Sequence, residues 1–323
     1  MTIPRIHTIE MPMPGMLGNV NCYAVVNGSR AALIDTGMAG PDCETAIQKK
    51  LAEIGHSPGS IEMVFCTHYH PDHCGMGKVF EDNGVPLYMS KKDAASLQRW
   101  LESIPMDAQL ATFFGEHQLP EDFGESVTPV FSYLRTLQQP CAPVAVDSSQ
   151  RTIDLAGVPF EMIPTPGHTD GHVCLVQREL NIVFTGDHIL PDSAVNILIQ
   201  EQSEHQSPLA VYLRSLEEIM ILGKMKGLPG HGVPIPDIRE RCSVLRDLHL
   251  QRVAQVRSVL CEEPFSATDI SSRAFGRKRR AFSRWLGMAQ TISCLEYLVQ
   301  HGEVQCHLQG NMRTYSLVDV KQI

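Results

Sequence analysis

The segment Thr67–His73 constrains this chain more than any other part of its sequence. It follows the apolar run Ile61–Cys66 directly and combines three imidazoles with one carboxylate: His68, His70, Asp72 and His73. Such a cluster at the end of a strand can hold two divalent metals, and paired metals generate hydroxide from water at neutral pH. A polar loop with unrelated histidines is the alternative, but it does not explain why residues of ligand type recur further along the chain.

Three later candidates stand at Gly or Pro breakers: His168 in Pro166-Gly167-His168, Asp187 in Gly186-Asp187-His188, and His231 in Pro229-Gly230-His231. The apolar runs Val158–Ile163 and Leu180–Phe184 precede the first two and predict strands. Four motifs therefore stand in order along the chain: His-x-His-x-Asp-His, Gly-His-Thr-x-Gly-His, Gly-Asp-His and Pro-Gly-His-Gly. In this order they resemble the motifs of the metallo-β-lactamase superfamily of binuclear metallohydrolases.

The resemblance implies seven metal ligands. His68, His70 and His168 would bind a first ion, and Asp72, His73 and His231 would bind a second ion. Asp187 would bridge the two ions. Neutral imidazoles combined with carboxylate oxygens suit Zn²⁺ and also tolerate iron or manganese. Because no cysteine belongs to this set, we expect a site with an open position for water, in which Asp72 and Asp187 are the catalytic carboxylates.

Asp35 ends the strand-like run Ala31–Ile34, and related proteins carry Asp-Thr-Gly at this place. We expect its carboxylate to accept the second N–H of a ligand imidazole and so to fix the tautomer of that ring. An ordinary turn at the end of a strand is the alternative interpretation. His172 and His188 lie next to ligand candidates, and we expect them to support the site without binding metal.

The resemblance also implies an α/β fold, the αββα sandwich of this superfamily, over residues 1–238. Residues 91–146 interrupt it with helical pieces, which we interpret as a lid with an apolar lining over the metals. A purely structural insertion that packs on the fold is the alternative. Residues 239–323 predict three helices followed by a hairpin with a Gly310-Asn311 turn, a pattern that resembles a winged-helix module. Residues 240–323 carry 12 Lys and Arg against 8 Asp and Glu, although the whole chain has a net charge of −9.

Composition narrows the class of protein further. No apolar run reaches the roughly 20 residues that cross a bilayer, and the first 20 residues lack the basic start and apolar core of a signal peptide. The 10 cysteines have no framework spacing, which favours a reducing compartment. We therefore expect a cytoplasmic protein with no membrane partner, which could also form oligomers.

The substrate is less constrained than the metal site. We expect a metal-bridging hydroxide to attack a small-molecule thioester or a related carboxylic ester. The basic cluster Arg277, Lys278, Arg279 and Arg280 would bind the phosphates of an acyl carrier, unless it is only a solvated loop or a nucleic-acid contact. An endoribonuclease acting on single-stranded RNA is the main alternative. A lactone hydrolase and a metal-stabilised DNA-binding regulator are further ones.

Overall fold

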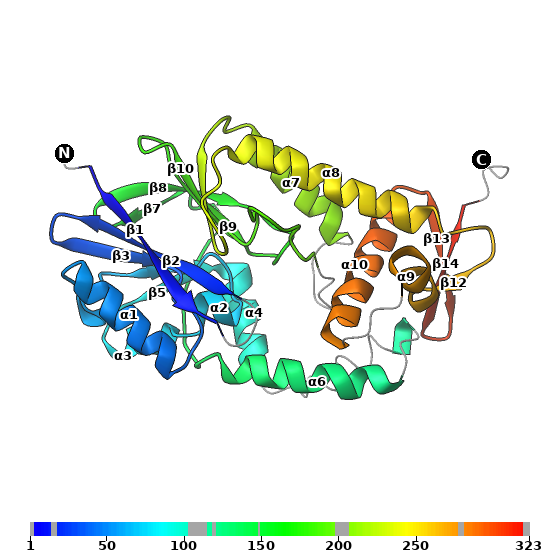
Figure 1. Cartoon of the computed structure of the whole chain (residues 1–323), viewed down its shortest axis with the longest axis horizontal. Helices are drawn as coiled ribbons and strands as arrows, with labels where there is room; N and C mark the ends of the chain where they lie inside the picture. The colour runs from blue at the N-terminus through cyan, green and yellow to red at the C-terminus, as the bar shows by residue number, and fades with distance from the viewer. Residues whose placement is uncertain are drawn as a thin grey trace. The chain divides into compact units, whose positions relative to one another are not determined.

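The computed structural model describes residues 3–13, 18–102, 115–117, 121–147, 149–197, 207–276 and 281–318. The chain forms two compact units. The first comprises residues 1–102, 134–195 and 218–242, and the second comprises residues 103–133, 196–217 and 243–323. Figure 1 shows both units, with the two larger sheets in the first and a small sheet in the second.

One sheet of the first unit has six strands in sequence order: β1 (Arg5–Pro12), β2 (Asn19–Asn27), β3 (Arg30–Ile34), β4 (Val64–Phe65), β5 (Leu87–Ser90) and β6 (Val144–Val146). Strands β1 to β3 are antiparallel, whereas β3 to β6 are parallel. Parallel neighbours need crossover connections, and helices serve here: α1 (Pro41–Glu53), α2 (Pro71–Cys74), α3 (Gly77–Asp82) and α4 (Lys91–Leu101). A 3-10 turn, η1 (Pro58–Ser60), precedes β4.

Strand β4 is shorter than the apolar run Ile61–Cys66 suggested. Only Val64 and Phe65 are paired with both neighbouring strands. The run still lies along β3, because the Glu62 N–H donates to the Ala31 carbonyl and the Met63 carbonyl accepts from Leu33. The short strand therefore ends immediately before the histidine-rich loop.

The second sheet has five strands in the order β11 (Lys226–Pro229), β10 (Ile182–Gly186), β9 (Val173–Gln177), β8 (Val158–Pro164) and β7 (Thr152–Leu155). Only β10 and β11 are parallel. Helix α7 (Pro208–Met220) leads to β11, and α8 (Ile238–Arg257) follows it. The first residue of α8, Ile238, lies against Gly227 on β11.

Successive side chains of a strand point to opposite faces, and β3 uses both faces. Leu33 belongs to a core shared with α1, α3 and α4, whereas Ile34 belongs to a core shared with strands of the second sheet. Phe160 and Phe184 meet Ile34 in that second core. Two mixed sheets packed face to face with helices outside them confirm the predicted α/β sandwich (Figure 1).

The second unit contains the C-terminal elements in the order helix, strand, helix, helix, strand, strand. After α8 come β12 (Phe265–Ser266), α9 (Ala267–Phe275), α10 (Ala281–Gln300), β13 (Val304–Gln309) and β14 (Met312–Leu317). The three strands form one antiparallel sheet in the order β12-β14-β13, and the predicted hairpin with its Gly310-Asn311 turn is present. Division of the chain at residue 238 and a winged-helix module beyond it remain predictions.

The predicted insertion, residues 91–146, contains α4, α6 (Glu121–Thr136) and β6, while its residues 103–114 and 118–120 lie outside the described part. A lid function for it remains a prediction. No helix among the described residues is long and apolar enough to cross a membrane.

Candidate metal centre

The candidate ligands lie in loops that follow the carboxyl ends of four strands, β4, β8, β10 and β11. In the first loop His68 and His70 are two residues apart in bends of non-helical backbone, and their rings converge, with Nε2 of His68 3.1 Å from Nδ1 of His70. Pro71 then begins the single turn α2, which carries Asp72 and His73. Proline suits this first helical position, because its ring sets φ and the amide hydrogen it lacks would have no partner there.

His68, His70 and His168 form one group. The Nδ1 atom of His70 lies 3.1 Å from Nε2 of His68 and 3.0 Å from Nε2 of His168. Three ring nitrogens therefore converge on one point, although His168 is 98 residues from His70 in the sequence. A tetrahedral ion with bonds of about 2.0–2.1 Å would hold its nitrogen ligands about 3.3 Å apart, close to the spacing seen here.

Asp72, His73, Asp187 and His231 form a second group, in which one ligand atom of each residue lies within 4.8 Å of the others. The Nε2 atom of His231 lies 3.1 Å from Oδ2 of Asp72. Asp187 also reaches the first group, because its Oδ2 lies 3.5 Å from Nε2 of His231 and 3.7 Å from Nε2 of His168. A carboxylate between the two groups is the arrangement that a bridging ligand requires.

Two buried atoms of the second group, His73 Nε2 and Asp187 Oδ1, make no hydrogen bond within the described part of the chain. They lie 3.4 Å apart. A buried polar atom without a partner costs about 1–3 kcal/mol, and a cation between these two atoms would remove that cost. The donor set, imidazole nitrogens with carboxylate oxygens, therefore fits divalent metals of the zinc, iron and manganese type.

The charge states of the two groups differ. Burial, followed by the neighbouring His168 imidazole, lowers the pKa of His70 to about 3, so this ring is neutral at pH 7. Burial also opposes charge on His231, but the Asp187 and Asp72 carboxylates outweigh it and raise the pKa of His231 to about 10. A metal that binds the second group therefore displaces a proton from an imidazole.

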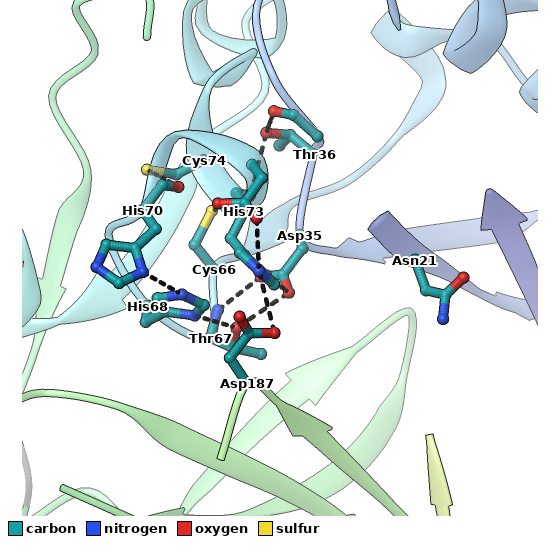
Figure 2. A network of polar contacts seen from close by, with 12 residues as sticks. Asn21, Asp35, Thr36, Cys66, Thr67, His68, His70, His73, Cys74 and Asp187 are labelled. Carbon is teal, nitrogen blue, oxygen red and sulfur yellow. Dashed lines mark hydrogen bonds and ion pairs between the residues drawn. The ribbon is translucent and has the colours of Figure 1, made fainter. Parts of the chain in front are cut away.

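Asp35 holds the imidazoles of both groups in place. Its Oδ2 lies 2.8 Å from Nδ1 of His73 and accepts the Thr67 hydroxyl hydrogen at 3.0 Å, and its Oδ1 accepts the Thr67 N–H at 2.7 Å. Since the Thr67 hydroxyl has given its hydrogen to Asp35, Nδ1 of His68 must donate to Thr67 Oγ1, 3.1 Å away. With Nδ1 of both rings in these contacts (Figure 2), their Nε2 atoms are the ones that would bind metal ions.

The loop that carries His231 is fastened to β2. Nδ2 of Asn21 donates to the carbonyls of Pro229 and Gly232, and the Tyr23 hydroxyl donates to Pro229 at 2.7 Å. Nδ1 of His231 lies 3.0 Å from a backbone carbonyl of the same strand, which directs Nε2 toward Asp72. The sequence near Asn21 and Tyr23 gives no sign of this role, because their partners lie more than 200 residues away.

Gly230 is required by close packing. A Cβ atom at this position would lie 2.5 Å from Oδ1 of Asp187 and 2.6 Å from Cε1 of His73. Any side chain here would push apart two members of the second group. The glycine of the Pro-Gly-His-Gly motif thus makes room for the ligands of another loop.

His172 supports Asp187 through one ring nitrogen, while its other ring nitrogen contacts Thr165. The Asp187 N–H donates to Nε2 of His172 at 3.2 Å, and Nδ1 lies 2.8 Å from the Thr165 hydroxyl. His188 is buried beside it, with ring centroids 5.7 Å apart. Neither residue belongs to the two groups of candidate ligands among the described residues.

Asp93 is another buried residue whose role has no local signal in the sequence. It lies in the first turn of α4 and accepts hydrogen bonds from the two loops that carry His68, His70 and His168. The pattern Ser90-x-x-Asp93 predicts a helix N-terminus, but it does not predict contacts outside the helix. The basic cluster Arg277–Arg280, proposed to bind substrate, lies outside the described residues.

A family model described as the metallo-beta-lactamase superfamily matches residues 15–231, a span that includes all seven candidate ligands. The chain belongs to the metallo-β-lactamase superfamily. A Bacillus subtilis superfamily relative named "Probable metallo-hydrolase YqjP" is 26% identical, over 96% of this chain and 97% of that protein. Together with the candidate metal ligands, these similarities make the chain a metallohydrolase.

Solved structures agree with this membership. A metallo-beta-lactamase family protein from Thermus thermophilus superposes with a TM-score of 0.84 at 26% identity, over 97% of this chain and 98% of that one. Among further relatives, an atrochrysone carboxyl ACP thioesterase from Cryptosporiopsis sp. is 24% identical over 80% of this chain. The chain spans 63% of that thioesterase's length.

Proposed function

We propose that this superfamily member is a thioesterase with two metal ions, of which Zn²⁺ is the expected species. The first ion would be held by His68, His70 and His168, and the second by Asp72, His73 and His231, with Asp187 shared. The observation that carries the proposal is the position of Asp187, whose Oδ2 lies within 3.7 Å of Nε2 atoms in both groups. Bound divalent ions would lower the pKa of water and polarise the carbonyl oxygen of the substrate.

The protein's own groups prepare the site for this chemistry. Asp35 would keep a proton on Nδ1 of His73 and, through Thr67, on Nδ1 of His68, so that both Nε2 atoms would present lone pairs to bound ions. His68 and His73 are fully buried, whereas the side chains of Asp72 and His231 are 16% and 23% exposed. Water and substrate can therefore approach from the side of Asp72 and His231.

Asp72 is suited to handle the proton of the attacking water. In the metal-free protein His73 and His231 lower the pKa of Asp72 to about 2 against the effect of burial. A bound cation in place of their charges would likewise favour the ionised carboxylate. Its Oδ2 is already held by Nε2 of His231 at 3.1 Å, which directs the carboxylate into the second group. We assign to Asp72 the orientation of the nucleophile by accepting a hydrogen bond from it.

The choice of thioesters rests on the relatives with that activity in their names, including the Cryptosporiopsis protein. An acyl carrier has a phosphate-bearing arm, and the basic cluster Arg277–Arg280 offers charges that would bind it. A polyanionic RNA fits less well, because the net charge of the whole chain is −9.

A metal-replete activity screen tests the proposal. Acyl-CoA, acylglutathione, a lactone and single-stranded RNA are offered at equal concentration, with release of thiol, acid or fragments as the measurement. We expect the highest kcat/KM on thioesters and loss of activity by at least about 100-fold in Asp187→Ala, with lowered metal content. Asp82→Ala serves as control, because Asp82 is exposed and pairs only with Lys78 among the described contacts.

A higher kcat/KM on RNA or on the lactone would refute the thioester as substrate, but the protein would still be a hydrolase. Full activity with two metals in Asp187→Ala would instead refute the assignment of the bridging ligand. A protein that hydrolyses none of the substrates and binds DNA would point to the regulator.

We also propose that residues 239–323 form a winged-helix-like module beside a metal-binding domain of residues 1–238. Support comes from the order of its elements, three helices with a three-stranded antiparallel sheet that ends in a hairpin. Within it, Tyr315 of β14 is fully buried and donates its hydroxyl to Glu296 of α10 at 3.5 Å. A hydrogen-exchange experiment would test the boundary, since two modules should lose protection at different denaturant concentrations.

A further inference from the structure

Asp93 accepts three hydrogen bonds although it is completely buried. Its Oδ2 accepts the Thr169 hydroxyl at 2.7 Å and the Tyr69 N–H at 3.2 Å, and its Oδ1 accepts the Gly171 N–H at 2.8 Å. Its own N–H donates to Ser90 Oγ at 3.2 Å, so Ser90 already caps α4. The carboxylate is therefore used for contacts outside its own helix.

The three donors belong to the two loops that supply the first group of candidate ligands. Tyr69 stands between His68 and His70, and Thr169 follows His168 directly. One carboxylate thus joins loops that are about 100 residues apart in the sequence, within two residues of every member of the group.

The packing around this contact leaves no freedom for the second loop. A Cβ atom on Gly171 would lie 2.5 Å from the backbone nitrogen of Asp93 and 2.6 Å from its Oδ1. The backbone of the loop therefore lies directly on the first turn of α4, with its N–H aimed at the carboxylate.

A buried carboxylate is expensive for the fold unless its hydrogen bonds compensate. Burial raises the pKa of Asp93 to about 7 even though Thr169, Gly171 and Tyr69 act in the opposite direction. A helix N-terminus alone does not require this cost, because an exposed Ser, Thr, Asn or Asp caps equally well. The cost is understandable if the carboxylate fixes the spacing of the two loops.

We propose that Asp93 is a positioning residue that sets the distance between His168 and the His68-x-His70 loop and thereby the affinity and geometry of the first metal site. The inference rests on the proposed function, because it requires that this group binds metal. Asp93 does not contact the metal or the substrate in this scheme. It acts through the backbone of Tyr69 and Gly171 and through the hydroxyl of Thr169.

The test compares Asp93→Ala, Asp93→Asn, Thr169→Val and Thr169→Ser in the full-length protein. Zn²⁺ affinities of both sites are measured by competition with a chromophoric chelator, and the Co²⁺-substituted proteins give absorption spectra that report ligand geometry. We expect Asp93→Ala to weaken the first site by about 10- to 100-fold, the usual effect of losing a group that orients ligands. The second site should change by less than about threefold.

Thr169→Val should weaken the first site in the same direction, and Thr169→Ser should restore the wild-type spectrum because it keeps the hydroxyl. Asp42→Ala is the matched control, since Asp42 lies in the first turn of α1 but is exposed. If Asp93→Ala does not fold, Asp93→Asn and Thr169→Val decide the question, because both keep the side-chain shape.

Unchanged affinity of the first site and an unchanged Co²⁺ spectrum in these variants would overturn the inference while leaving the proposed function intact. Equal weakening of both sites would also overturn it, since that result indicates general loosening of the fold. A wild-type protein that binds no metal would refute the proposed function and this inference with it.

Discussion

Asparagine at position 35 would keep the shape of the side chain and reverse the direction of two hydrogen bonds. The Thr67 backbone N–H can only donate, so the amide oxygen must face it and the amide nitrogen must occupy the place of Oδ2. There it would point N–H groups at Nδ1 of His73 and at the Thr67 hydroxyl. His73 would then carry its proton on Nε2, and Thr67 would donate to His68, which would also move that ring's proton to Nε2.

The magnitude follows from the bonds involved. A hydrogen bond from His73 to a carboxylate contributes about 1.5–3 kcal/mol. Asp35→Asn should therefore weaken metal binding at the second site by roughly 2 kcal/mol, which corresponds to about a 30-fold higher Kd. The relay through Thr67 to His68 is neutral and worth about 1 kcal/mol, so the first site should weaken by about fivefold. Asp35 has φ 63°, and asparagine adopts this left-handed region as readily as aspartate, so the backbone stays unstrained.

Chelator competition on Asp35→Asn measures both affinities, and circular dichroism verifies the fold. Asp82→Asn, an equivalent change on the exposed Asp82, provides the control. Affinities within twofold of wild type at both sites would show that Asp35 does not determine the tautomers, and the relay would have to be abandoned.

Three further predictions concern other parts of the chain. Gly230→Ala should lower kcat by about 100-fold, because the added Cβ would lie 2.5 Å from Oδ1 of Asp187. Gly115→Ala is the control and should leave kcat unchanged, because a Cβ there meets nothing within 4 Å. Equal kcat values for the two variants would contradict the close packing at Gly230. In the metal-free protein, burial and the nearby Asp170 carboxylate raise the pKa of Asp93 to about 7. The unfolded chain has the ordinary pKa of about 4, so between about pH 4 and 7 the folded state binds a proton that the unfolded state has lost. The free energy of unfolding should therefore fall as pH rises through this window, by on the order of 4 kcal/mol at most. In Asp93→Asn the urea midpoint should no longer fall with pH. The same pH dependence in the variant and the wild type would refute the raised pKa of Asp93. Replacing Arg277, Lys278, Arg279 and Arg280 with alanine should raise KM for acyl-CoA by about 10-fold and leave small esters unaffected; no change on acyl-CoA would indicate a solvated loop.

The seven candidate ligands could be named from the sequence because the short motifs that carry them, at the ends of strands, resemble those of the superfamily. Strand ends and Gly or Pro breakers are local features, and the residues beside them specify their own turns. The C-terminal helices and the hairpin were predictable for the same reason, since helical spacing and a Gly-Asn turn are local signals. The length of β4 was not, because pairing on both sides depends on where β3 and β5 lie.

The residues that hold the ligands could not be found in this way. Asn21 and Tyr23 fasten a loop more than 200 residues away, and Asp93 joins two loops that the sequence separates by about 100 residues. Nothing in the neighbourhood of these residues distinguishes them from an ordinary strand or an ordinary helix N-terminus.

By itself, then, the sequence determined the type of metal site and the strands that carry it, because ligand identity and turn chemistry are written in adjacent residues. Only the tertiary structure decided which imidazole Asp35 contacts, that Thr67 connects Asp35 to His68, and which loops are tied together. Those properties depend on distances between distant segments, and such distances exist only after both sheets have packed against each other.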